Sequence, residues 1–198
     1  MTNLFNKLEI DAFKAGITPR TDQSRDWFRK RVSDMRSSRI SRNSMMRQEP
    51  VVLKNRAIVG SMGMFFYDPK HKETLPYYDR FPLVIVIGPA KDGFLGLNLH
   101  YLPPLLRAKF LDALMETASN TSYDETTRFR ITYNLLQRAA RMKYYKPCVK
   151  HYLNKHMKSR FALVPGAEWE IAVFLPTQDF AKATANQVYT ESRRKING

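Results

Sequence analysis

The chain has 198 residues, of which 33 are Lys or Arg and 18 are Asp or Glu, so its formal net charge is +15 at pH 7. Hydrophobic residues make up 43% and aromatic residues 12%, which is enough for a packed core and excludes a disordered chain. The single cysteine excludes an internal disulfide framework and a four-thiolate zinc site. The excess of positive charge predicts a polyanionic partner.

The N-terminal sequence MTNLFNKLEIDAFKAG lacks the basic segment and the long apolar run of a signal peptide. The longest apolar stretch, FPLVIVIG, is well short of the roughly 20 residues that a membrane helix needs. We therefore expect a soluble protein of the intracellular type that has no membrane partner.

Residues 1–50 are predicted to form a basic N-terminal arm. From residue 20 to residue 56 there are eleven Lys or Arg and four acidic residues, and the stretch RSSRISRNSMMR offers little apolar surface to bury. Just before this stretch, Phe28, Val32 and Met35 share one helical face. They predict a short helix that must dock on something, because an isolated helix of this length is marginally stable.

Residues 51–198 are predicted to form a single α+β domain built around a small antiparallel sheet. Aromatic and β-branched residues indicate strands near 62–67, 82–88 and 94–101. The last two are joined by so few residues that they must pair antiparallel.

Helices are predicted to follow these strands and to cover the sheet. Pro103 and Pro104 favour a helix start, because the N–H groups that prolines lack would be unpaired in the first turn. The helices are expected over residues 104–116, 124–144 and 148–161 and near the C-terminus, while residues 166–176 fit either a helix or a strand.

The strongest functional feature is the stretch 138–160, which holds eight Lys or Arg and no acidic residue. On the predicted helices 124–144 and 148–161, apolar residues such as Leu136 gather on one face and basic or amide residues on the other. Such faces suit phosphate oxygens. With the arm, they give the candidate DNA-binding residues Arg130, Asn134, Arg138, Arg141, Lys143, Lys146, Lys150, Lys155, Lys158, Arg36, Arg39 and Arg42.

The alternative for these residues is a solvated cationic surface with no ligand. The sequence holds no helix-turn-helix, zinc-finger or ribonucleoprotein signature, so contact with DNA is expected to be mostly to the backbone and to weaken with salt. Aromatic residues near 65–81 could stack on bases, but packing over the sheet is the favoured interpretation.

No catalytic or metal-binding constellation is predicted. Cys148, His151 and His156 have the spacing C-x2-H-x4-H, but a structural zinc site needs four ligands. His100 is isolated in the sequence, and acids such as Asp79 lack the paired spacing of a two-metal nuclease. GSMG and GFLG are not followed by the Lys-Ser/Thr of a phosphate loop. We therefore expect neither an enzyme nor a cofactor, and no small-molecule substrate.

The segments YDPKHKETLPYYDRFPLVIVI and GFLGLNLHYLPPLLRAKFLDALM resemble virion proteins of T-even-type tailed bacteriophages, and the chain is similar to their DNA end protector group. The similarity continues through ETTRFRITYNLLQRAARMKYYKPCVKHYL and EWEIAVFLPTQDF, so it spans roughly residues 60–180 and leaves out the Ser/Arg stretch at 33–47.

The resemblance implies a non-enzymatic virion protein that binds the ends of the linear genome and shields them from host exonuclease. It also implies a place in the virion, and in the host cytoplasm during assembly. The alternative is a structural component of the neck, tail or baseplate, whose arm joins neighbouring virion subunits. The resemblance assigns no functional residue.

Overall fold

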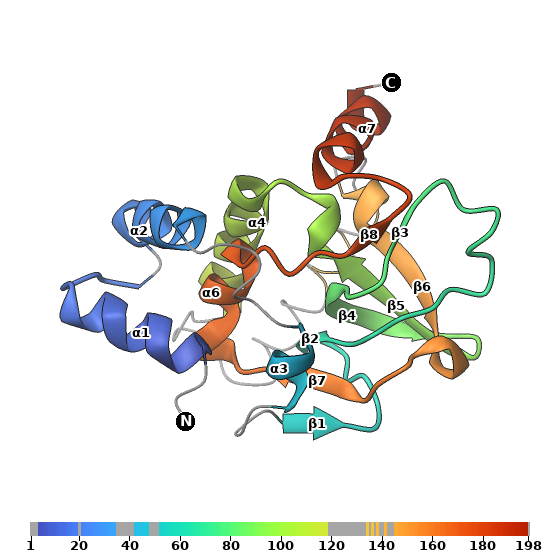
Figure 1. Ribbon diagram of the computed structural model, residues 1–198, viewed down its shortest axis with the longest axis horizontal. Coiled ribbons are helices and arrows are strands. Elements are labelled where there is room, and N and C mark those ends of the chain that lie inside the picture. The colour runs from blue at the N-terminus through green and yellow to red at the C-terminus, as the bar shows by residue number, and fades with distance from the viewer. Residues whose placement is uncertain are drawn as a thin grey trace.

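The computed structural model describes residues 4–19, 21–34, 42–47, 52–118 and 145–197, together with positions 134, 136, 138 and 141. In this part of the chain, helices pack against an antiparallel sheet, as Figure 1 shows. The predicted α+β class is confirmed.

Among the described residues, the main sheet has six antiparallel strands. Their spatial order is β1 (Val52–Lys54), β7 (Phe161–Val164), β2 (Met62–Met64), β4 (Leu83–Ala90), β5 (Gly93–Asn98) and β6 (Val149–Leu153). A second, two-stranded sheet pairs β3 (Tyr78–Asp79) with β8 (Phe180–Ala181). Gly63 allows β7 to lie against β2, because a Cβ there would come within 2.1 Å of the Phe161 ring.

The predicted strands near 62–67, 82–88 and 94–101 correspond to β2, β4 and β5, with shifted ends. β2 stops at Met64, although Tyr67 still forms an isolated bridge with Met157. β5 stops at Asn98, whose side chain accepts a hydrogen bond from the backbone N–H of His100 and so starts the short 3-10 helix η2 (Leu99–Tyr101).

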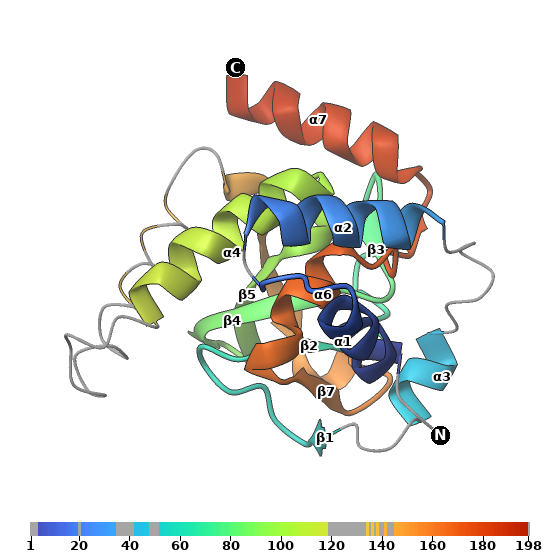
Figure 2. The same ribbon diagram turned by 90° about the vertical axis from the view of Figure 1, so that its left-hand side faces the viewer.

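The helices gather mainly on one side of the sheet, where α2 runs alongside α4 (Figure 2). They are α1 (Leu4–Lys14), α2 (Asp22–Ser33), α3 (Arg42–Arg47), α4 (Pro104–Ala118), α6 (Trp169–Phe174) and α7 (Ala185–Asn197). The alternating side chains of β4 serve both faces of the sheet. Leu83 and Ile85 enter the large core with the helices, whereas Val84 and Val86 join a smaller cluster rich in aromatic residues on the opposite face.

The N-terminal helices pack on the rest of the protein, which differs from the predicted arm. Leu8 on α1 and Phe28 on α2 are buried in the large core. Arg25 on α2 forms an ion pair with Asp112 on α4, with 2.6 Å between nitrogen and oxygen. The predicted short helix is thus present and docked, while residues 35–41 of the expected arm lie outside the described residues.

The prediction of a helix over residues 148–161 is wrong. Residues 149–153 form β6, which pairs with β5 and is flanked by two 3-10 helices, η3 (Lys146–Cys148) and η4 (Asn154–His156). The apolar residues of this stretch fit a period of 3.6 as well as a period of 2. The unpaired edge of β5 decides in favour of a strand, because its backbone groups need hydrogen-bond partners.

The ambiguous segment 166–176 contains the helix α6 after a turn of 3-10 helix, η5 (Gly166–Glu168). The indole N–H of Trp169 donates to the carbonyl oxygen of Val164 at 2.9 Å, which anchors α6 to the end of β7. The helix expected near the C-terminus is α7, whose first turn is capped by reciprocal hydrogen bonds between Thr184 and Gln187.

Candidate nucleic-acid interface

An open cleft of about 850 Å³ lies on the face of the main sheet opposite the large core. Its floor includes Val86 on β4 and Phe94 on β5, which belong to the aromatic cluster of this face. Two loops form its walls: residues 55–59, between β1 and β2, and residues 154–160, between β6 and β7. We call this region the basic cleft.

The rim of the basic cleft is cationic. Arg56 stands on one wall, and Lys158 and Arg160 stand on the other, all three exposed to solvent. None of them forms an ion pair with an acidic residue in the part of the chain that the structure describes. The exposed amides Asn55 and Asn154 also line the cleft, and none of the described lining residues is acidic.

The loop 154–160 is fixed in position by backbone hydrogen bonds. The N–H of Asn154 donates to the carbonyl oxygen of Asp92 at 2.9 Å, and the N–H of Lys158 donates to that of Phe66 at 2.7 Å. The N–H of Phe66 in turn donates to Ser159 Oγ at 2.9 Å. Because this wall is already ordered, a ligand would lose little binding energy in ordering it.

Three of the predicted DNA-binding residues lie on the helix expected over 124–144. Asn134, Arg138 and Arg141 are helical and exposed, whereas Leu136 is fully buried, as the projection of this helix predicts. The other positions predicted on that helix and in the arm lie outside the described residues: Arg130, Lys143, Arg36 and Arg39.

The remaining predicted residues have different surroundings, because the second basic helix does not exist. Lys146 in η3 and Lys155 in η4 are exposed, and Lys158 is on the rim of the basic cleft. Lys150 on β6 is half-buried with its ammonium nitrogen 4.0 Å from the centre of the Tyr101 ring. Burial lowers the pKa of Lys150 to about 8, so this candidate DNA-binding residue is not a fully solvated cation.

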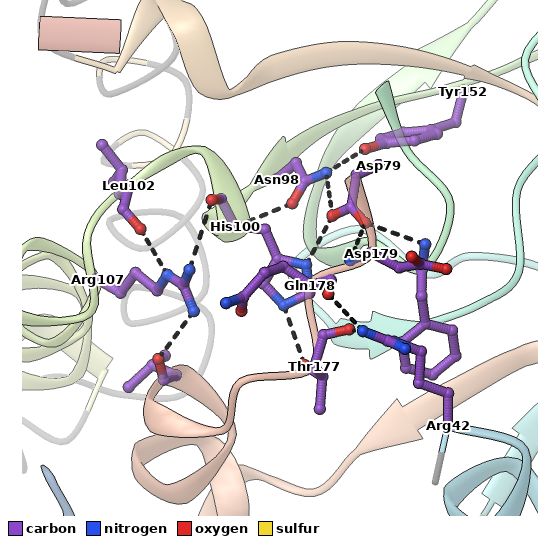
Figure 3. A network of polar contacts seen from close by, with 12 residues as sticks. Arg42, Asp79, Asn98, His100, Leu102, Arg107, Tyr152, Thr177, Gln178 and Asp179 are labelled. Atoms are coloured by element: carbon purple, nitrogen blue, oxygen red, sulfur yellow. Dashed lines mark hydrogen bonds and ion pairs between the residues drawn. The ribbon is translucent and has the colours of Figure 1, made fainter. Parts of the chain in front are cut away.

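Arg42 is also placed differently from a free arm residue. Its Nε donates to the carbonyl oxygen of Thr177 at 2.8 Å and its Nη2 donates to that of Gln178 at 2.5 Å. The guanidinium thereby fixes α3 to the segment between α6 and β8 (Figure 3).

A second group of polar residues, which we call the buried polar network, lies inside the protein (Figure 3). Asp79 Oδ2 is 2.6 Å from His100 Nδ1, and His100 Nε2 is 3.1 Å from Thr177 Oγ1. The amide nitrogen of Asn98 donates to Asp79 Oδ2 and to the Tyr152 hydroxyl. Sequence reasoning treated His100 as isolated, because these partners are far from it along the chain.

The protonation states within this network follow from burial and from its hydrogen bonds. Burial opposes ionisation of Asp79, but His100 and the backbone N–H groups of Asp179 and Phe81 outweigh it and hold the pKa of Asp79 below its usual value. Burial lowers the pKa of His100, so its imidazole is neutral at pH 7. His100 Nδ1 therefore donates to the Asp79 carboxylate, and Nε2 accepts from the Thr177 hydroxyl.

The contacts from Asp79 through His100 to Thr177 resemble those of a hydrolytic triad, but the burial of these three residues argues against catalysis. His100 is 0% exposed, Thr177 1% and Asp79 4%, so a substrate cannot reach the hydroxyl. Arg107 on α4 is fully buried next to this network and donates to the carbonyl oxygens of Leu102 and Val173. These groups hold α4, η2 and α6 together.

The Cys148, His151 and His156 spacing does not mark a metal site. Cys148 is buried, which raises the pKa of its thiol to about 12, and each imidazole bonds to a backbone carbonyl oxygen. Among the described residues, no group of three or more His, Cys, Asp or Glu could hold a metal ion. Nor does any helix in the described ranges have the length and apolarity to cross a membrane.

Taken together, the described residues form an α+β protein whose open cleft carries unpaired cations and whose buried polar groups serve the fold. A family model described as phage T4 terminal DNA protecting protein matches residues 2–193, and the chain belongs to that family. No curated protein and no solved structure matches the chain. Membership confirms the resemblance to the DNA end protector group of tailed bacteriophages and gives the chain a protective role at DNA termini. It lends no support to a place in the neck, tail or baseplate.

Proposed function

We propose that this protein binds the ends of linear phage DNA through the basic cleft and through other exposed basic residues, and that it protects the ends by covering them. The observation that carries the proposal is the cationic rim of the cleft, where Arg56, Lys158 and Arg160 meet from two distant segments with no described acidic residue among them. Cations without a protein partner are free to replace the counterions of DNA phosphates.

Further phosphate contacts are proposed for the basic residues that sequence analysis singled out. Asn134, Arg138, Arg141 and Lys146 are exposed, and Lys155 is exposed next to the cleft wall. Arg130, Lys143, Arg36 and Arg39, which lie outside the described residues, belong to the same proposal. Lys150 and Arg42 do not, since each already interacts within the protein.

Protection by this protein requires no bond to be made or broken. An exonuclease must bring its active site to the last phosphodiester bond, and a protein bound over that bond excludes it. The net charge of +15 speeds the encounter with DNA by long-range attraction. The protein would therefore act in the virion and on the genome in the host cell, with DNA as its partner and with no cofactor.

The test compares a blunt linear duplex with the same duplex closed by a hairpin at each end, over a series of salt concentrations. We expect tighter binding to the open duplex. If about four of the proposed cations contact phosphate at one time, log K should fall with log salt at a slope of roughly −3 to −4. Digestion by an exonuclease should slow in proportion to occupancy. Equal affinity for both duplexes would contradict end binding, and negligible affinity at physiological salt would contradict DNA as the partner.

A further inference from the structure

We infer that the basic cleft takes the terminal nucleotide of one DNA strand, with its base over the apolar floor and its phosphates on the rim. This inference rests on the proposed function and specifies what that site binds. In this proposal, the protein distinguishes an end from the interior of a duplex by holding a nucleotide that has left the base stack.

The cleft has the size and lining for a single nucleotide. Its volume of about 850 Å³ lies within the roughly 300–1,000 Å³ of pockets that hold small ligands. Val59, Met157 and Phe94 supply apolar surface for the flat face of a base. The amides of Asn55 and Asn154 offer donors and acceptors for a base edge.

The cations of the rim can contact the phosphates that follow that base. Arg56 comes from one of the two loops that line the cleft, and Lys158 and Arg160 come from the other. These loops adjoin the paired strands β1 and β7, where Lys54 is opposite Phe161, so the three cations border the apolar floor together. A strand whose last base enters the cleft would place its following phosphates along this rim. Apolar contact for the base with cations for the backbone is the combination that binds unpaired strands in general.

The preference for an end follows from the cost of extracting a base. An internal nucleotide is stacked on both sides and paired, so flipping it out costs a few kcal/mol. A terminal nucleotide is stacked on one side only, and an unpaired terminal nucleotide has no pairing to break. The same cleft would therefore take an overhanging nucleotide best, a blunt end less well and a closed end least.

The closing experiment uses one duplex sequence with three kinds of terminus: one unpaired nucleotide, blunt, and closed by a hairpin. The fluorescent base 2-aminopurine is placed either at the last position or at an internal position. We expect affinity to fall in the order overhang, blunt, closed. On saturation, the fluorescence of the terminal probe should change while that of the internal probe stays constant.

Variants that fill the basic cleft test whether the terminal nucleotide binds there. Ala57→Phe places a ring inside the cleft, and Asn55→Phe places one at its exposed rim, where the fold is at little risk. Each should weaken binding to the overhang by about tenfold, the energy of one stacked base. Asn186→Phe on the exposed surface of α7 is the matched control and should bind as the unchanged protein does.

Two kinds of failure are distinguishable. If open ends are preferred and protected while the terminal probe is silent and both filling variants keep full affinity, the nucleotide inference is overturned and the proposed function stands. If open and closed duplexes bind equally well, both are overturned.

Discussion

The buried polar network and the basic cleft use charged residues in opposite ways. In the network, Asp79 and Arg107 are buried and each is held by several hydrogen bonds from within the protein. In the cleft, Arg56, Lys158 and Arg160 are exposed and unpaired with the described acidic residues. The residues that most resemble a catalytic site are therefore enclosed by the fold, whereas the exposed cations of the cleft are the contacts proposed for DNA.

The largest effect on the free energy of unfolding is expected in the buried polar network. Asp79→Ala would leave the His100 imidazole N–H, the Asn98 amide and the backbone N–H of Phe81 without their acceptor. Each buried donor left without an acceptor costs about 1–3 kcal/mol, so the free energy of unfolding should fall by several kcal/mol. Denaturant unfolding should show this loss, and the exposed Asp26→Ala should stay within about 0.5 kcal/mol of the unchanged protein.

If Asp79→Ala folds normally but abolishes DNA protection, the network is part of the functional site and the contrast between the two regions fails. We expect DNA affinity to persist in this variant wherever it remains folded.

A second prediction concerns the docking of the N-terminal helices on the large core. Phe28 on α2 is 4% exposed and Phe13 on α1 is 84% exposed. Phe28→Ala should cost about 3 kcal/mol of unfolding free energy, and Phe13→Ala should cost less than about 0.5 kcal/mol. Thermal melting of the two variants checks this. Equal melting temperatures would show that residues 4–34 are not docked on the core and form the predicted arm.

A smaller effect is expected from Lys150. Its pKa in the folded protein is about 8, below the roughly 10.4 of an unfolded lysine. As pH rises past 8, the folded state releases this proton before the unfolded state does, so the unfolded state binds more protons and stability rises. Between about pH 7.5 and pH 9 the gain should be roughly 1 kcal/mol.

Unfolding free energies measured across this pH range check the prediction. Lys150→Met should remove the rise, whereas Lys146→Met, at an exposed lysine in η3, should retain it. The same rise in both variants would show that another group is responsible.

The sequence was informative where the evidence is local. Strands β4 and β5 are contiguous in the chain and separated by a tight turn, so their pairing could be predicted. The start of α4 was likewise predictable to within one residue from Pro103 and Pro104. β6 was mistaken for a helix because its partner strand lies more than fifty residues away, and periodicity carries no information about which edge is open.

The functional features were harder to predict for the same reason. His100 meets Asp79 across 21 residues and Thr177 across 77 residues of chain. Arg56 and Arg160 each lie in a basic stretch that the sequence analysis noted, yet neither was singled out. Only the folding of β7 between β1 and β2 brings them to one cleft.

The most direct test of the central claim compares two triple variants that lose the same charge. One replaces the cleft cations, as Arg56→Gln, Lys158→Gln and Arg160→Gln. The other replaces exposed lysines of α1 and α2, as Lys7→Gln, Lys14→Gln and Lys30→Gln. Binding of each to an open-ended duplex is measured over the same salt series.

We expect the cleft variant to lose about 2–3 units from the magnitude of the salt slope, close to 0.9 per lost phosphate contact. The helix variant should retain the slope of the unchanged protein, since its lysines lie away from the cleft. Equal changes in both variants would contradict the account, because binding would then depend on total charge and not on the basic cleft.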